Sequence, residues 1–394
     1  MTLRGDAETR RLRPRVLHLS HSNAAGGAEF ALIRMLQAGA SWRAALLVPP
    51  MGGRGVFQQL PIDVPLRMSG VRQPAGVVAG SPLLVAEATV RLAMQAAATR
   101  AHPGFRRADI VDANTTRAAA YGALAARTSR VPFVVHMRDM ADPEAIGRAG
   151  FEMMRRIVLP RADGVVADTR ATMESAAPYL RRGTVTEVIP SASGLLVGGA
   201  AAPLPSGPLV VGMLARIDPW KAQAELLDAF AQAFPDGDAR LQFAGDALFG
   251  HEEYLARLHR RAAELDVSDR VDFLGHVDDV DALLRTWHIA VQYSLRSEPL
   301  GQNVLQYLAA GRIVVVADEG GPAEWVEHGV NGVRVPPRDV ASLADALRRL
   351  RAGPALREFL AAAAARTPDL LSDPTVAASH ADFYTRVRER SDAN

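Results

Sequence analysis

The chain has 394 residues, with 45 lysines and arginines against 43 aspartates and glutamates, and a formal net charge of +2. A chain of this length is expected to divide into two domains. The small net charge and scattered basic doublets argue against nucleic-acid binding, and the absence of cysteine excludes disulfides and thiolate metal sites. Residues 1–15 are charged and contain no apolar segment of signal-peptide length, which favours a cytoplasmic location.

Short apolar runs alternate with helical patterns in the first half of the chain. Strands buried on both faces and joined by helices are typical of a parallel α/β sheet. The predicted strands are 15–20, 44–48, 110–112, 133–136, 164–167 and 186–189. The predicted helices are 29–37, 82–99, 117–127, 143–159 and 170–180.

A second α/β series follows residues 191–208, which are rich in glycine, alanine and proline and read as a linker. Its predicted strands are 209–214, 241–244, 271–274, 289–293, 313–317 and 332–335, and its predicted helices are 224–234, 251–265, 280–286, 301–310, 324–327 and 340–351. We therefore expect two doubly wound domains, residues 1–195 and 209–372, with a linker at 196–208. A helical tail at about 373–394 is free to pack back on the first domain.

Ligands in doubly wound sheets bind at the carboxyl ends of the strands, so polar motifs directly after strands are informative. The first strand leads to Gly26 and Gly27, just before a helix whose first turn carries Glu29. Such a glycine pair lets backbone N–H groups approach an anion, although a tight turn with a capping glutamate explains it equally well. The pattern is neither a dinucleotide fingerprint nor a Walker loop.

In the second domain, Arg216 and Lys221 follow the strand 209–214, and Lys221 is the only lysine of the chain. Two cations in one loop are suited to a departing diphosphate, although solvated surface charge is the plainer alternative. Further along, Glu298 and Pro299 follow the strand 289–293, and the sequence predicts Pro299 in the first turn of a helix. Gln306 would then lie about 12 Å along that helix on nearly the same face.

These motifs, in this order, resemble those of the retaining GT-B glycosyltransferases, specifically glycosyltransferase family 4. The resemblance covers nearly the whole chain and is strongest between residues 209 and 337. The motifs that carry it there are Phe-Leu-Gly-His-Val at 273–277, Glu-Pro-Leu-Gly at 298–301, Ala-Gly at 310–311, Gly-Gly at 320–321 and Asn-Gly at 331–332. The resemblance implies the GT-B fold, with two Rossmann-like domains facing across a cleft that holds a nucleotide sugar.

The resemblance also implies roles for individual residues. Arg216 and Lys221 would bind the donor diphosphate, with Gly26 and Gly27 approaching the same phosphates. Glu298 would contact hydroxyls of the donor sugar. The other implied contacts are backbone N–H groups at Leu300 and Gly301, the ribose at Gln306, the base at Gly275, His276 and Val277, and the transferred sugar at His136.

Three positions depart from the family pattern. The second glutamate of the family's E-x7-E motif is Gln306 here, which keeps hydrogen bonding but loses the charge. The glycine that usually follows the lysine is Ala222, and the usual Asn-Gly after the last strand of the first domain is replaced by residues 191–194. None of these changes removes the two cations or Glu298, so we expect an active enzyme.

The expected reaction is transfer of a sugar, with retention at the anomeric carbon, to a hydroxyl of a glycan, lipid-linked or small-molecule acceptor. No metal and no cofactor is expected, and a UDP-sugar is the first choice of donor, followed by GDP- and dTDP-sugars. The alternatives are a non-catalytic nucleotide-sugar-binding subunit and a sugar-nucleotide epimerase of the same fold. Residues 151–159 mix apolar and basic side chains, which leaves peripheral contact with the inner face of a membrane as a weaker prediction.

Overall fold

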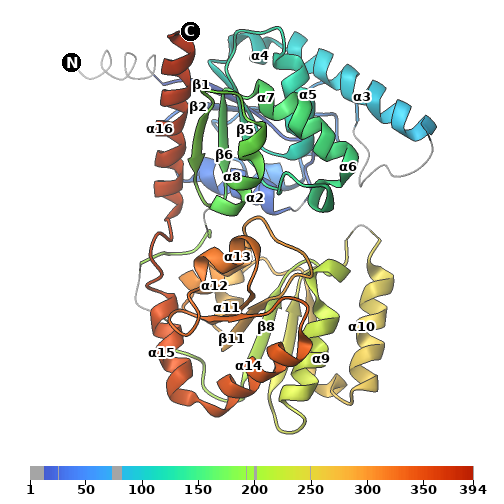
Figure 1. Ribbon diagram of the computed structural model, residues 1–394, viewed down its shortest axis with the longest axis vertical. Coiled ribbons are helices and arrows are strands. Elements are labelled where there is room, and N and C mark those ends of the chain that lie inside the picture. The colour runs from blue at the N-terminus through green and yellow to red at the C-terminus, as the bar shows by residue number, and fades with distance from the viewer. Residues whose placement is uncertain are drawn as a thin grey trace. The chain divides into compact units, whose positions relative to one another are not determined.

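The computed structural model describes residues 13–24, 26–72, 82–191, 193–198, 202–248 and 250–393. The chain divides into two compact units, residues 1–192 with 373–394 (unit 1) and residues 193–372 (unit 2). Each unit is a parallel sheet with helices packed around it (Figure 1). The two Rossmann-like sheets confirm the predicted α/β class.

Unit 1 contains a seven-stranded parallel sheet in the order β3-β2-β1-β4-β5-β6-β7. Its strands are β1 (Arg15–Leu19), β2 (Arg43–Val48), β3 (Leu66–Met68), β4 (Ile110–Ala113), β5 (Phe133–Met137), β6 (Gly164–Ala167) and β7 (Val185–Val188). Its described helices are α2 (Gly27–Gln37), α3 (Pro82–Ala101), α4 (Pro103–Arg107), α5 (Thr116–Ala126), α6 (Pro143–Met153), α7 (Leu159–Arg161), α8 (Arg170–Ala176) and α16 (Asp373–Asp392). The central strands are buried on both faces, which explains their continuous apolar sequences.

Unit 2 contains a six-stranded parallel sheet in the order β10-β9-β8-β11-β12-β13. Its strands are β8 (Val210–Leu214), β9 (Arg240–Ala244), β10 (Val271–Gly275), β11 (Ile289–Gln292), β12 (Ile313–Ala317) and β13 (Val333–Val335). Its described helices are α9 (Gln223–Ala233), α10 (Glu252–Glu264), α11 (Val280–Leu284), α12 (Gln302–Ala309), α13 (Gly320–Trp325), α14 (Val340–Ala352) and α15 (Pro354–Ala364). In each sheet the strand order changes direction at one point, although all strands stay parallel. This reversal point lies between β1 and β4 in unit 1 and between β8 and β11 in unit 2.

The last helix, α16, packs on unit 1, although its sequence lies at the opposite end of the chain (Figure 1). The hydroxyl of Tyr384 donates to the carboxylate of Asp112 at 2.9 Å, and His18 Nδ1 lies 2.9 Å from the same oxygen. Trp42 Nε1 donates to His18 Nε2 at 3.1 Å. Because an indole N–H can only donate, His18 Nε2 accepts and Nδ1 carries the hydrogen that points at Asp112.

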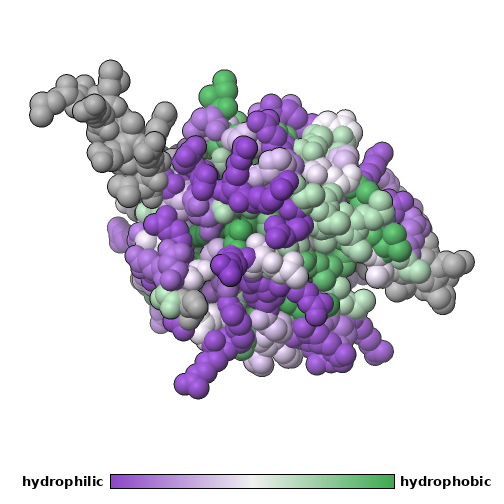
Figure 2. Space-filling view, turned by 90° about the horizontal axis from the view of Figure 1, so that it is seen from above, coloured by the Kyte–Doolittle hydropathy of each residue, from purple (hydrophilic) through white to green (hydrophobic). Residues whose placement is uncertain are grey.

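Residues 151–159, which suggested membrane contact, turn their apolar side chains inward. Met154, Val158 and Leu159 are at most 1% exposed and belong to the core of unit 1. The segment runs from the end of α6 through one turn of π-helix (Met154–Val158) into α7 without a gap. None of the described helices combines the length and apolar character that a membrane span requires. Figure 2 shows that the apolar surface on the face seen from above is interrupted by hydrophilic side chains.

Candidate functional site

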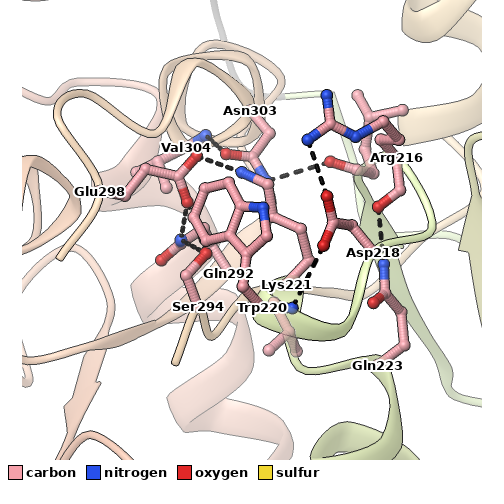
Figure 3. Close-up of polar contacts among 12 residues, drawn as sticks. Arg216, Asp218, Trp220, Lys221, Gln223, Gln292, Ser294, Glu298, Asn303 and Val304 are labelled. Carbon is pink, nitrogen blue, oxygen red and sulfur yellow. Dashed lines mark hydrogen bonds and ion pairs between the residues drawn. The ribbon is translucent and has the colours of Figure 1, made fainter. Parts of the chain in front are cut away.

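Lys221 and Glu298 form an ion pair at the carboxyl end of the unit 2 sheet (Figure 3). Lys221 closes a short 3-10 turn (Pro219–Lys221) after β8, and Glu298 lies in the loop after β11. Because β8 and β11 are neighbours at the point where the strand order reverses, the two loops meet although they are 77 positions apart in sequence. Such a reversal point is where doubly wound sheets bind their ligands.

Three side chains hold the Glu298 carboxylate. Besides Lys221, Ser294 donates its hydroxyl at 2.5 Å and Gln292 donates its amide at 2.6 Å to the second carboxylate oxygen. Burial favours a higher pKa for Glu298, but the Lys221 charge and these hydrogen bonds keep its pKa below the ordinary value. Glu298 is therefore a fixed carboxylate with its oxygens in defined positions.

Arg216 lies in the same loop as Lys221 and pairs with Asp218 at 2.8 Å. Asp218 also caps the turn by accepting the N–H of Trp220, and His251 Nε2 lies 3.5 Å from its carboxylate. Gln223 donates to the carbonyl of Arg216 at 2.9 Å, which fixes the backbone of the loop. Arg216 and Lys221, the two predicted cations, thus lie in one loop whose backbone is fixed by hydrogen bonds.

Ala222 adopts a left-handed conformation, with φ 65° and ψ 35°, between the turn and α9. Side chains with a Cβ rarely adopt this conformation because of steric contact with the backbone, whereas glycine does so freely. The loop geometry therefore explains on physical grounds why glycine suits this position, and it shows that alanine can be accommodated.

The loop that contains Glu298 packs closely against the start of α13. The N–H of Gly321 donates to the carbonyl of Glu298 at 2.8 Å, and a Cβ on Gly321 would lie 2.4 Å from the carbonyl oxygen of Pro299. Gly320 has φ 66°, and a Cβ there would lie 2.6 Å from the same Glu298 carbonyl. This glycine pair supports the backbone that places Glu298.

The prediction that Pro299 lies in the first turn of a helix is wrong. The helix α12 begins at Gln302, with Gly301 as its N-cap at φ 69°. Glu298 therefore lies in the preceding loop, and the distance of about 12 Å along one helix does not apply to Glu298 and Gln306. Leu300 and Gln306 are each 6% exposed, and within the described residues the Gln306 amide has no hydrogen-bonding partner.

The turn after β10 contains Gly275, His276 and Val277. Gly275 has φ 65° and its carbonyl accepts the N–H of Gly245 at 2.7 Å, whereas the His276 side chain is 52% exposed. A cavity of about 480 Å³ opens beside Gly275. Its lining includes Ile217, Gly245, Asp246, Leu255, His259 and Phe273. The predicted base-binding turn thus borders a hollow large enough for a flat ring.

In unit 1, Gly26 and Gly27 stand at the start of α2 as predicted, with Gly26 as the N-cap. The Glu29 carboxylate folds back over them, since a Cβ on Gly26 would lie 2.5 Å from Glu29 Oε2. Glu29 is 6% exposed, and burial raises its pKa to about 7, partly offset by hydrogen bonds from its own backbone and Ser20 and by the Arg138 charge. A carboxyl group that is half protonated near neutral pH thus lies at this loop.

His136, at the end of β5, is 3% exposed and takes part in a buried polar network. Its Nδ1 lies 3.1 Å from the Arg138 guanidinium, which also donates to Asn114 at 3.1 Å and to Asp168 at 3.1 Å and bonds Ser191. Burial and the Arg138 charge lower the pKa of His136, so the imidazole is neutral. His136 thus contacts protein groups rather than open surface.

Sequence reasoning missed several polar residues that the structure gathers at strand ends. Gln292 and Ser294 hold Glu298, and Asn114 and Asp168 hold Arg138. Their common signal is a polar side chain at or just after the carboxyl end of an otherwise apolar strand. No group of three or more histidine, aspartate or glutamate side chains within the described ranges is placed to hold a metal ion.

Comparison with known proteins shows similarity to sugar-transferring enzymes. Residues 200–367 match the family model of glycosyl transferases group 1. The D-inositol 3-phosphate glycosyltransferase of Streptomyces bingchenggensis is 30% identical over 318 residues, which are 72% of this chain and 68% of that relative.

Solved structures are similar over almost the whole chain. HepE of Anabaena in complex with UDP and glucose is 27% identical, covers 95% of this chain and 100% of its own, and has a TM-score of 0.76. The same protein in complex with UDP-glucose gives a TM-score of 0.75 over the same shares of each chain. Both neighbours support the GT-B fold, which the two sheets of this chain already indicate.

Proposed function

The chain belongs to the group 1 glycosyltransferases, and on that premise we propose that it transfers a sugar, with retention at the anomeric carbon, from a nucleoside-diphosphate sugar to an acceptor hydroxyl. We assign it to glycosyltransferase family 4. The observation that carries the proposal is the Lys221–Glu298 pair at the reversal point of the unit 2 sheet, with Arg216 in the same loop. In this arrangement Lys221 and Arg216 can bind a diphosphate, and the adjacent Glu298 carboxylate can accept hydrogen bonds from sugar hydroxyls.

The donor is proposed to be a UDP-sugar, because HepE, which is similar over 95% of this chain, is described in complex with UDP and with UDP-glucose. Its base would bind at Gly275, His276 and Val277, beside the cavity that Gly275 lines. Gln306 would contact the ribose through an uncharged amide. Backbone N–H groups at Leu300 and Gly301 would contact the diphosphate. GDP- and dTDP-sugars are the next donors to test.

In the proposed reaction the acceptor oxygen attacks the anomeric carbon on the face from which the diphosphate leaves. The bond between that carbon and the phosphate oxygen breaks, and the leaving phosphate takes the acceptor proton. Arg216 and Lys221 stabilise the negative charge that develops on the phosphate, which is the largest electrostatic demand of the step. This scheme uses neither a protein nucleophile nor a divalent metal.

Unit 1 is proposed to supply the remaining contacts. Backbone N–H groups at Gly26 and Gly27 would approach the donor phosphates, as helix N-termini commonly do. His136 would act near the transferred sugar as a neutral imidazole, positioned by Arg138. The acceptor is a glycan, a lipid-linked or a small-molecule hydroxyl, and D-inositol 3-phosphate is worth testing because a relative carries that name. A cytoplasmic location remains part of this proposal.

The proposal is tested by incubating the protein with UDP-, GDP- and dTDP-sugars, with and without acceptors, in excess EDTA. We expect release of nucleoside diphosphate and an α-linked product from an α-linked donor, identified by NMR, with loss of activity in Glu298→Ala and Lys221→Ala. Inversion of the anomeric centre, or dependence on added metal, would contradict the mechanism.

The same samples separate two alternatives. A sugar-nucleotide epimerase would convert the donor without any acceptor, which NMR of the donor detects directly. A non-catalytic binding subunit, motivated by Gln306 in place of the usual glutamate, would bind a nucleotide sugar but neither transfer nor hydrolyse it.

A further inference from the structure

The two charged groups proposed to bind the donor contact each other in the structure. The Lys221 ammonium contacts the Glu298 carboxylate and lies 3.9 Å from the centre of the Trp220 ring (Figure 3). The side chains of Lys221 and Glu298 are only 16% and 12% exposed. Within the described residues, Lys221 is the only cation that pairs with Glu298, because its other two partners, Ser294 and Gln292, are neutral.

A nucleoside diphosphate without its sugar would provide a new partner for Lys221 but none for Glu298. Its phosphate would attract Lys221 and leave the Glu298 carboxylate buried with two neutral donors and a nearby anion. Removing one partner of a buried ion pair is strongly unfavourable, because the remaining charge is neither hydrated nor compensated.

An intact nucleotide sugar would replace both partners at once. Its diphosphate would accept from Lys221, while sugar hydroxyls would donate to the Glu298 carboxylate in place of the ammonium. Hydrogen bonds to a charged group are stronger than those between neutral groups, so Glu298 is compensated.

We propose that the Lys221–Glu298 ion pair makes the site discriminate between the intact donor and the nucleoside-diphosphate product. This inference rests on the proposed function and adds a role for the pair. Once the sugar has been transferred, Glu298 loses its hydroxyl partners and recaptures Lys221. The re-formed pair competes with the product for the ammonium and so favours its release.

The test is calorimetric titration of UDP, GDP and dTDP into the wild-type protein and into Glu298→Gln. Glutamine keeps the size of the side chain and can still accept from Ser294, but it does not hold Lys221 by charge. We expect the affinity of the accepted nucleoside diphosphate to rise at least about tenfold in Glu298→Gln, while the affinity of the corresponding nucleotide sugar rises by less. Unchanged or weaker binding of the diphosphate by folded Glu298→Gln would overturn the inference.

The control is Asp236→Asn. Asp236 pairs with Arg351 at 2.9 Å in an exposed ion pair of the same unit, in the loop between α9 and β9 at the amino end of the strands. Its removal should leave every affinity unchanged. A tenfold rise in this variant too would show that a general loss of negative charge is responsible, and would also overturn the inference.

Glu298→Asp is the second variant, in case Glu298→Gln does not fold. It keeps the charge but shortens the side chain by one methylene, so the contact with Lys221 lengthens, and we expect a smaller rise in the same direction. If none of the three diphosphates binds the wild-type protein or any variant, the proposed function itself fails. If the wild-type protein binds one of them and the affinities of both variants do not rise, only the discrimination by the ion pair fails.

Discussion

Glu29→Gln should stabilise unit 1 at alkaline pH and leave its stability unchanged at acidic pH. Glu29 is buried at the start of α2, and burial raises its pKa from the ordinary value of 4.5 to about 7. Between these two values the folded protein binds the proton that the unfolded chain has lost, so stability falls as pH rises. Below pH 4.5 both states are protonated and the penalty is absent.

The size of the effect follows from the shift. One pKa unit corresponds to about 1.4 kcal/mol, so a shift from 4.5 to about 7 corresponds to a penalty of about 3 kcal/mol at pH 8 and above. Glutamine has nearly the same shape and remains neutral at every pH. The variant should therefore gain up to about 3 kcal/mol at pH 8 and almost nothing at pH 4.5.

Denaturant unfolding at pH 4.5 and pH 8 measures this difference. The change in Trp42 fluorescence reports the unfolding of unit 1, because Trp42 is buried there. The other three tryptophans, at 220, 287 and 325, lie in unit 2 and report the unfolding of that unit. Glu87→Gln is the matched control, since the Glu87 side chain is 55% exposed on α3 and its removal should not change the pH dependence. A difference between Glu29→Gln and wild type that is the same at both pH values would refute burial as the cause.

Three further substitutions test the construction of unit 2. Lys221→Arg should fold but lose most transfer activity in steady-state assays, because a planar fork replaces the compact ammonium beside Trp220. Ala222→Gly should raise the free energy of unfolding by about 0.5–1 kcal/mol, since φ at this position is 65°. Arg312→Met should lower the free energy of unfolding by about 3–5 kcal/mol in denaturant titrations, because Arg312 is fully buried and its loss leaves three backbone carbonyls without their donor.

Most strands could be predicted because they are buried on both faces and consist of β-branched and apolar residues, as in Ile313–Ala317. The strand β3 (Leu66–Met68) was missed because it has three residues, lies at the sheet edge and is largely exposed. Such a strand leaves neither a long apolar run nor a clear alternation in the sequence.

The helix predicted at 301–310 starts within one residue of α12, but the loop that holds Pro299 before it could not be read from local signals. Proline favours the first turn of a helix, so Pro299 suggested a start three residues too early. In the structure this segment is a loop that packs against α13. The N–H of Gly321 donates to the Glu298 carbonyl, and Gly301 lies so close to α13 that a Cβ there would be 2.7 Å from the Pro322 ring. These contacts join residues that are 23 and 21 positions apart in the sequence, and they overrode the preference of proline for the first turn of a helix.

The residue types of the candidate site were predictable, but their pairing was not. Arg216, Lys221 and Glu298 each follow a strand, and ligand sites form at strand ends. Which strand ends meet depends on the order β8-β11, which brings together segments that are distant in sequence. The Lys221–Glu298 contact follows from that order rather than from any local pattern, whereas the donors Gln292 and Ser294 are only six and four residues from Glu298 in the sequence.

The proposed exchange of partners gives a physical reason for the one lysine among 45 basic residues, of which the other 44 are arginine. The Lys221 ammonium contacts the Glu298 carboxylate and lies 3.9 Å from the centre of the Trp220 ring, and its side chain is 16% exposed. An ammonium can turn its three donors from Glu298 to a phosphate with a small change of torsion. A guanidinium binds a carboxylate through two parallel bonds in one plane, so it must break both before it can face a new partner. The exchange of partners that we propose for Lys221 therefore favours lysine over arginine at this position, even in a chain that otherwise uses arginine throughout.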